Sequence, residues 1–188
     1  MLLVGVGIHI GQGGGTPDRP GPSAVVPVAP AAPDPRTPSG FAEFREPKAG
    51  IALSYPQDWV RLQPADPQVV LLAVKNPGYS MLVRELDLQT PIDPGDMSAA
   101  KALADKMVLA DKTIIILSQQ QIVLAGLPGY YYLYSFSDPV TGQLAVHSHF
   151  FVFKDRKMIS FVFQVIPSDK FGAAAGTFDR ITASVRII

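Results

Sequence analysis

Three long segments rich in aromatic and β-branched residues follow one another near the end of the chain, at residues 130–137, 143–153 and 157–166. Such segments have the length and composition of β-strands. The stretches between them, 138–142 and 154–156, are short enough to form hairpins. Because a hairpin reverses the chain direction, these segments predict an antiparallel meander around which the rest of the fold must be built.

Shorter strands are predicted before the meander, at residues 41–46, 51–55, 69–74 and 81–88, and in two segments, 114–117 and 121–124, that suggest one bent strand. Turn residues separate several of them, including Asn76-Pro77-Gly78 and a predicted turn at residues 126–129. Trp59 follows another turn, and we expect this large side chain to fill part of the core.

Two segments have helical periodicity. The first begins after Pro94-Gly95 with Asp96 as a candidate cap, ends near residues 110–112, and has an apolar stripe of Ala100, Leu103, Ala104, Met107 and Val108. The second begins at Ser168, also a candidate cap, and its apolar face holds Phe171, Ala174, Phe178, Ile181 and Val185. Together these patterns predict an α+β fold, an antiparallel sheet with helices packed on it as an α/β/α sandwich.

Residues 1–40 differ in composition from the rest of the chain. They contain 8 of the 18 prolines and 8 of the 16 glycines. Residues 11–40 are predicted to be a disordered Pro/Gly/Ala-rich linker, because they bury too little apolar surface to offset their conformational entropy. Residues 1–10 are hydrophobic but shorter than the roughly 20 residues that span a bilayer, so we expect part of a longer membrane segment. Residues 41–188 remain as one globular domain.

Four short patterns of this domain together resemble the PsbP-like superfamily. They are Phe41 with Phe44, Gly-Ile-x-Leu-x-Tyr-Pro-x-x-Trp at 50–59, Gly-Leu-Pro-Gly at 126–129 and Phe-Asp-Arg-Ile-x-x-Ser at 178–184. The superfamily includes an extrinsic protein of the oxygen-evolving complex, a yeast Ran-binding import factor and actinobacterial LpqN-type lipoproteins. The resemblance implies an α/β/α sandwich that docks onto other molecules and has no common chemistry. The Pro/Ala-rich linker is most similar to tethered actinobacterial members, although the cysteine that anchors the lipoproteins is missing.

The composition argues against several kinds of chemistry. Without cysteine, the chain has no disulfide, thiolate nucleophile or cysteine metal site. Lys+Arg and Asp+Glu both number 16, so no basic excess favours nucleic acid as a partner. The sequence has neither a Gly-x-Ser-x-Gly motif nor a phosphate-binding loop. We therefore expect a protein that is not an enzyme and uses no cofactor.

His147 and His149 are the candidate metal ligands. They lie two residues apart on a predicted strand, so both imidazoles point to the same face. With a carboxylate from a neighbouring strand they could hold zinc or copper. The alternative is a pair of partly buried or rim histidines, because Ala145, Phe151 and Phe153 share that face.

Tyr130, Tyr132 and Tyr134 share one face of the first meander strand. A row of tyrosines can form a partner surface or a platform on which sugars stack. The alternative is that the row packs beneath a helix, with its hydroxyls reaching the rim. Nucleic-acid stacking is set aside, because no cluster of Lys and Arg accompanies the row.

Two functions from different classes follow from these features. The first is a non-enzymatic, extracytoplasmic docking domain that is anchored to the cell membrane through residues 1–10 and binds a protein or a cell-envelope component. The second is a metal- or small-molecule-binding protein that uses His147 and His149. A weaker alternative is a cytoplasmic protein-docking module, against which the linker argues because such a module needs no spacer. We expect the first function.

Overall fold

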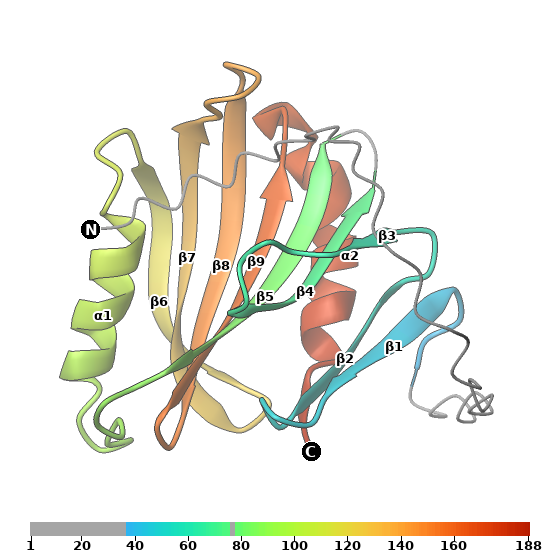
Figure 1. Ribbon diagram of the computed structural model, residues 1–188. Coiled ribbons are helices and arrows are strands. Elements are labelled where there is room, and N and C mark those ends of the chain that lie inside the picture. The colour runs from blue at the N-terminus through green and yellow to red at the C-terminus, as the bar shows by residue number, and fades with distance from the viewer. Residues whose placement is uncertain (1–36, 76–77) are drawn as a thin grey trace, which may run out of the picture.

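The computed structural model describes residues 37–75 and 78–188, in which two antiparallel sheets and two α-helices form a layered domain (Figure 1). The larger sheet has seven strands in the spatial order β3 (Val60–Leu62), β4 (Val69–Lys75), β5 (Tyr79–Asp87), β9 (Lys157–Val165), β8 (Leu144–Lys154), β7 (Leu127–Ser137) and β6 (Ile115–Leu124). Each pair of neighbours is antiparallel.

The helices and the smaller sheet cover the two faces of the larger sheet. In the smaller sheet, β2 (Ile51–Pro56) pairs with both β1 (Phe41–Glu46) and β10 (Arg186–Ile187). Helix α1 (Ser98–Val108) packs on one face, and α2 (Phe171–Ala183), which follows the short 3-10 helix η1 (Ser168–Lys170), packs on the other with the smaller sheet. No helix in the described residues is both long and apolar enough to cross a bilayer.

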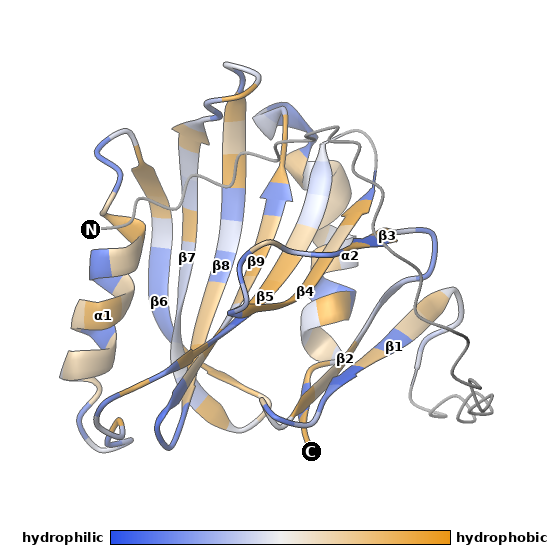
Figure 2. Cartoon of the chain, in the orientation of Figure 1, coloured by the Kyte–Doolittle hydropathy of each residue, from blue (hydrophilic) through white to orange (hydrophobic). Residues whose placement is uncertain are grey.

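Two clusters of buried side chains hold these layers together. Hydropathy alternates along several strands of the larger sheet, as period-two exposure requires (Figure 2). On the α2 side, the ring of Phe178 stacks on Phe163 with centroids 4.9 Å apart, and Trp59 meets Phe178 edge-on at 6.4 Å. The predicted place of Trp59 in the core is therefore confirmed.

The predicted meander is confirmed, because β7, β8 and β9 pair in sequence order. The bent strand is also confirmed. It is the single strand β6, whose register with β7 shifts between Ile116 and Ser118. The arrangement of antiparallel sheet and flanking helices matches the predicted α+β class.

The turn predicted at residues 126–129 is wrong by about two positions. Ala125 and Gly126 make the turn, with φ angles of 52° and 82°, and β7 already begins at Leu127. Gly129 lies inside β7, where an added Cβ would come within 2.0 Å of the carbonyl oxygen of Phe151. Gly129 thus permits close approach of β8 rather than a turn.

The helix caps predicted at Asp96 and Ser168 are also wrong. Helix α1 begins at Ser98, and the residue at the cap position is Met97, whose side chain makes no capping hydrogen bond. Oδ1 of Asp96 accepts a hydrogen bond from the Ser98 N–H at 2.9 Å. The 3-10 helix η1 begins at Ser168 itself, after Pro167 and without a side-chain cap. The carboxylate is thus one position too early to be the cap.

Candidate functional site

The two predicted metal ligands converge on one tyrosine hydroxyl. Pairing of β7 with β8 places Tyr134 opposite His147, and its hydroxyl lies 3.0 Å from Nδ1 of His147 and 3.2 Å from Nδ1 of His149. Nε2 of His147 lies 2.8 Å from Oε1 of Gln164 on β9. That amide oxygen can only accept, so Nε2 of a neutral His147 donates to it and Nδ1 of His147 accepts from the Tyr134 hydroxyl. The Tyr134 oxygen in turn accepts a hydrogen bond from Nδ1 of His149.

Burial keeps this cluster neutral. Burial lowers the pKa of His147 to about 4. Burial, followed by the neighbouring His147, places the pKa of His149 well below its ordinary value. Burial also raises the pKa of the Tyr134 hydroxyl. Nε2 of His149 is buried and has no hydrogen-bond partner among the residues that the structure describes.

The cluster lacks the carboxylate that the metal hypothesis requires. In residues 37–75 and 78–188, no group of three or more His, Asp or Glu side chains lies close enough together to hold a metal ion. The neighbouring strand β9 supplies Gln164, an amide, opposite His147. His147 and His149 therefore correspond to the partly buried pair that was the alternative interpretation.

The tyrosine row lies beneath α1 and not at the surface. Tyr132 is 1% exposed, and its hydroxyl donates to Oδ1 of Asp105 at 2.7 Å. The Tyr130 hydroxyl donates to the carbonyl oxygen of Met97 at 3.3 Å, and Tyr134 is 6% exposed. The predicted partner surface on Tyr130, Tyr132 and Tyr134 is therefore corrected, because these side chains are buried in one cluster with the alanines of α1.

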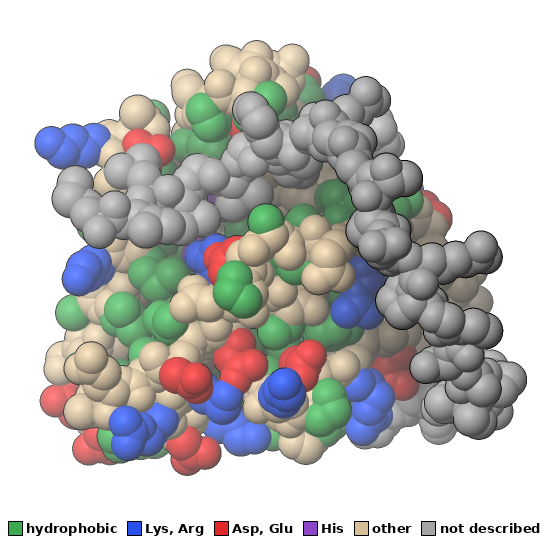
Figure 3. Space-filling view, in the orientation of Figure 1, with side chains coloured by type: hydrophobic (Ala, Val, Ile, Leu, Met, Phe, Trp, Pro, Cys, Tyr) green, Lys and Arg blue, Asp and Glu red, His purple; other side chains and the backbone are tan. Residues whose placement is uncertain are grey.

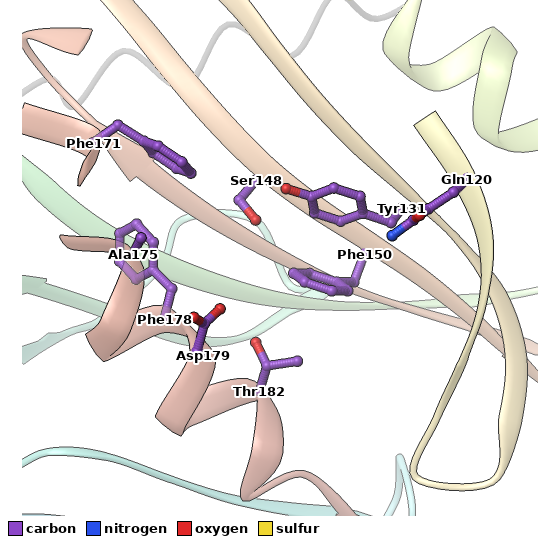
Figure 4. Close-up of a pocket in the computed structure, with 9 residues that line it drawn as sticks. All are labelled: Gln120, Tyr131, Ser148, Phe150, Phe171, Ala175, Phe178, Asp179 and Thr182. Atoms are coloured by element: carbon purple, nitrogen blue, oxygen red, sulfur yellow. The ribbon is translucent and has the colours of Figure 1, made fainter. Parts of the chain in front are cut away.

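A groove of about 330 Å³ opens on the opposite face of the sheet, between α2 and strands β6 to β8 (Figure 4). Its floor consists of Tyr131 and Phe150, whose ring centroids lie 4.8 Å apart. Phe171 and Phe178 line it from α2, with their ring centroids 6.3 Å apart. A volume of this size can hold a small ligand or one large side chain of a partner.

Polar groups approach this aromatic groove from both sides. Asp179 and Thr182 extend from α2 toward the floor, and Gln120 of β6 lies at the opposite rim (Figure 4). Oγ1 of Thr182 is buried without a hydrogen-bond partner in the described part of the chain. Asp179 forms no ion pair or hydrogen bond with any residue that the structure describes.

A second cavity of about 300 Å³ lies along another side of α2, next to Trp59. Its charged groups already have partners: Nζ of Lys75 is 3.0 Å from Oδ2 of Asp58, and the guanidinium of Arg180 lies 5.2 Å from the centre of the Phe41 ring. The carboxylate of the first groove is thus more available to a ligand than the charges of the second.

Strand β6 is the last strand of the larger sheet in the described residues, and it lies beside the first groove. Within the described residues it pairs with β7 alone. None of its ten residues is charged, and its side chains of Ile115, Leu117 and Val123 are 60%, 54% and 75% exposed. The opposite edge strand, β3, has only three residues and carries Arg61. A long edge strand without protecting charges is a template for pairing with another strand.

The groove and the edge were not among the sites predicted from the sequence. Gln120, Tyr131 and Asp179 come from three elements that are not adjacent in sequence, so no motif joins them. The available signal was the uncharged segment that ends at Leu124, which indicates an accessible edge only after the order of strands is known.

No family model matches the chain, and no curated protein matches it significantly. The cyanobacterial PsbP protein CyanoP of Synechocystis sp. PCC 6803 is similar in structure, with a TM-score of 0.63, 14% identity, and coverage of 85% of this chain and 99% of that one. The Ran-binding protein Mog1p of Saccharomyces cerevisiae has a TM-score of 0.54, 11% identity, and coverage of 78% and 95%.

A protein of Bacteroides thetaiotaomicron has a TM-score of 0.57 and 12% identity, and 79% of this chain matches 49% of that longer one. Identities this low establish the fold and nothing about activity. The PsbP-like fold expected from the four sequence patterns is therefore confirmed.

Proposed function

We propose that residues 41–188 form a non-enzymatic docking domain that binds an extended segment of a protein partner along the free edge of β6. The observation that carries this proposal is a ten-residue edge strand without charge and with three exposed aliphatic side chains. An edge strand leaves part of its backbone N–H and C=O groups without sheet partners, and an added strand completes them. Soluble proteins commonly protect such edges with Lys, Pro, short length or a β-bulge. Of these devices β6 has only the register shift between Ile116 and Ser118 near its start.

A structural neighbour supports a binding role on this fold. Mog1p of Saccharomyces cerevisiae is a Ran-binding protein, so the same architecture serves protein recognition there. Lys and Arg side chains are mixed with Asp and Glu on the face that Figure 3 shows. Such mixing favours contacts with proteins over the one-sided positive surface that nucleic acid requires.

The histidine cluster supports the non-enzymatic part of the proposal. A general base must reach the proton that it removes. In this cluster, His147 is engaged by Tyr134 and Gln164, and Nε2 of His149, which has no partner among the described residues, is buried. The groove on the other face offers a carboxylate and hydroxyls but no histidine to activate them.

We also propose that the domain acts outside the cytoplasm and is tethered to the cell membrane through residues 1–10. Its partner in that compartment is a protein or a cell-envelope component. The order of apolar segment, Pro/Gly/Ala-rich segment and domain supports this location. A cytoplasmic docking module is the alternative. Cell fractionation tests it: the full chain should sediment with membranes, and deletion of residues 2–10 should release it. Equal solubility of both forms contradicts the tether.

Photo-cross-linking in the native cells tests the docking edge. A photoreactive phenylalanine derivative replaces Leu117 in the full chain, and the control position is Val140, which is 66% exposed in the hairpin between β7 and β8. We expect position 117 alone to cross-link, and the attachment points to map to one extended segment of the partner. Val123→Lys should abolish the product. No product at 117, or equal products at both positions, contradicts the proposal.

A further inference from the structure

We infer that the groove between α2 and strands β6 to β8 receives a single Lys or Arg side chain of the segment that docks on β6. This inference rests on the proposed function, because the docking segment is what brings the cation to the groove. It identifies the partner chemically as an extended protein segment with a basic residue at the position that faces α2.

The aromatic lining suits a cation. The faces of aromatic rings attract Lys ammonium and Arg guanidinium groups within about 6 Å. Tyr131, Phe150, Phe171 and Phe178 all line this one groove, and the first two are tilted by 48° with centroids 4.8 Å apart. The four rings thus give the groove an aromatic lining, which attracts a positive charge.

An unpaired carboxylate gives the groove its charge preference. Asp179 lines the recess and has no ionic or hydrogen-bonding partner among the described residues. The neighbouring Arg180 does not neutralise it, because its guanidinium lies over the ring of Phe41. A carboxylate is an acceptor with room for two N–H donors, and a guanidinium supplies them in matching geometry.

A second acceptor is also unused. Oγ1 of Thr182, a lining residue of this groove, is buried without a hydrogen-bond partner in residues 37–75 and 78–188, although a buried polar atom normally has one. It lies one helical turn after Asp179 on the same face of α2, and Figure 4 shows both side chains directed to the aromatic floor. Both acceptors therefore face the site that a basic side chain would occupy.

The strand that adds to β6 can deliver such a side chain. Pairing places Gln120 of β6 opposite Tyr131 of β7, so both side chains lie on the groove face. A further strand would lie about 4.8 Å beyond β6 and about 10 Å from β7. The long side chains of Lys and Arg can extend over Gln120 toward the recess from there.

The test uses the full chain and two capped synthetic peptides of sequence Thr-Val-X-Val-Thr, in which X is arginine or its uncharged isostere citrulline. Two-dimensional NMR titration follows the backbone amides. We expect the arginine peptide to shift the resonances of Gln120, Tyr131 and Asp179, and to bind about tenfold more tightly than the citrulline peptide.

Asp179→Asn should remove this difference between the peptides. Asp155→Asn is the matched control, because Asp155 is an exposed carboxylate at the far hairpin between β8 and β9, and it should leave the difference unchanged. A circular dichroism melt of each variant verifies that the fold is retained.

Three results would overturn the inference. Equal binding of both peptides along β6 would leave the docking edge in place but remove the cation site. No shift at millimolar peptide, or shifts confined to other faces, would remove the groove as a binding site. Shifts of the same resonances on concentration of the chain alone would assign the edge to a second copy instead. The cross-linking result for Leu117 decides the docking edge separately from these outcomes.

Discussion

The Tyr134 hydroxyl lies 3.0 Å from Nδ1 of His147, which in turn reaches Gln164 through its other nitrogen. This geometry requires a neutral imidazole, because Nδ1 must accept the hydroxyl proton. Burial, which lowers the pKa of His147 to about 4, also favours the neutral imidazole. The folded protein therefore opposes protonation of both histidines, whereas the unfolded chain permits it at the ordinary histidine pKa of about 6.5.

We expect the free energy of unfolding to decrease as the pH falls from about 6.5 toward 4. In that range the unfolded chain binds more protons than the folded chain, so acid favours unfolding, by up to about 1.4 kcal/mol per pH unit for each histidine. Urea unfolding at several pH values measures the slope. His147→Gln should reduce it, since glutamine does not titrate. A wild-type stability that stays constant over this range would contradict the neutral cluster.

Carboxylates cause a separate loss at lower pH. Hydrogen bonds from Ser98 and Thr113 lower the pKa of Asp96 and Asp111. Their contribution to stability is present above the unfolded pKa of about 4 and is lost below it. The histidine effect can therefore be measured above about pH 5, where these carboxylates are almost fully ionised in both the folded and the unfolded chain.

Tyr134→Phe should destabilise the domain by about 1–3 kcal/mol, because it leaves polar nitrogens of His147 and His149 without their shared partner in the interior. Thermal or urea unfolding at pH 7.5 measures the change. Tyr131→Phe is the control, since Tyr131 makes no hydrogen bond with a described residue, and it should change stability much less. Similar losses in both variants would mean that the cluster contributes little.

Metal analysis of the purified full chain should find no stoichiometric zinc or copper, because the histidines engage Tyr134 and Gln164 and no carboxylate joins them in the described residues. Mass spectrometry of wild type and of a His147→Ala/His149→Ala variant measures this. Metal at one equivalent in the wild type, lost in the variant, would restore the metal-binding hypothesis.

The meander was predictable because the strand pattern is visible in the sequence of each of its three segments. Each of β7, β8 and β9 is long, and the connections between them leave only one way to pair. Strand β10 was not predictable, because its two residues, Arg186 and Ile187, are too few to show the alternation of apolar and polar residues that indicates a strand. The pairing of β5 with β9 was also hidden, since it joins segments that are distant in sequence.

The candidate site was less predictable than the fold. The shared face of His147 and His149 follows from strand periodicity, but the burial of the tyrosine row depended on which face α1 covers. The groove depends on the position of Asp179 relative to Tyr131, which packing of α2 decides. Chemistry that arises from non-local packing leaves no local pattern in a single sequence.

Gly129→Ala should destabilise the domain by about 1–3 kcal/mol, because the new methyl group would lie 2.0 Å from the backbone oxygen of Phe151 and push β7 from β8. Gly172→Ala is the opposite control. It lies in α2 with nothing within 4 Å of an added Cβ, so the helix propensity of alanine should stabilise the domain by about 0.5–1 kcal/mol. Chemical unfolding compares the two variants, and equal effects would contradict the close approach of β7 and β8.

Charges on the β6 edge should suppress self-association without changing the fold. Leu117 and Val123 are 54% and 75% exposed, so Leu117→Lys/Val123→Lys should alter the unfolding free energy by less than about 0.5 kcal/mol per site. An uncharged edge can pair with another copy during mild heating, and lysine there opposes such pairing. Light scattering during slow heating should show aggregation of the wild type before that of the variant. Val140→Lys adds a charge away from the edge and should not protect. Equal protection by Val140→Lys would mean that net charge, and not the edge, controls association.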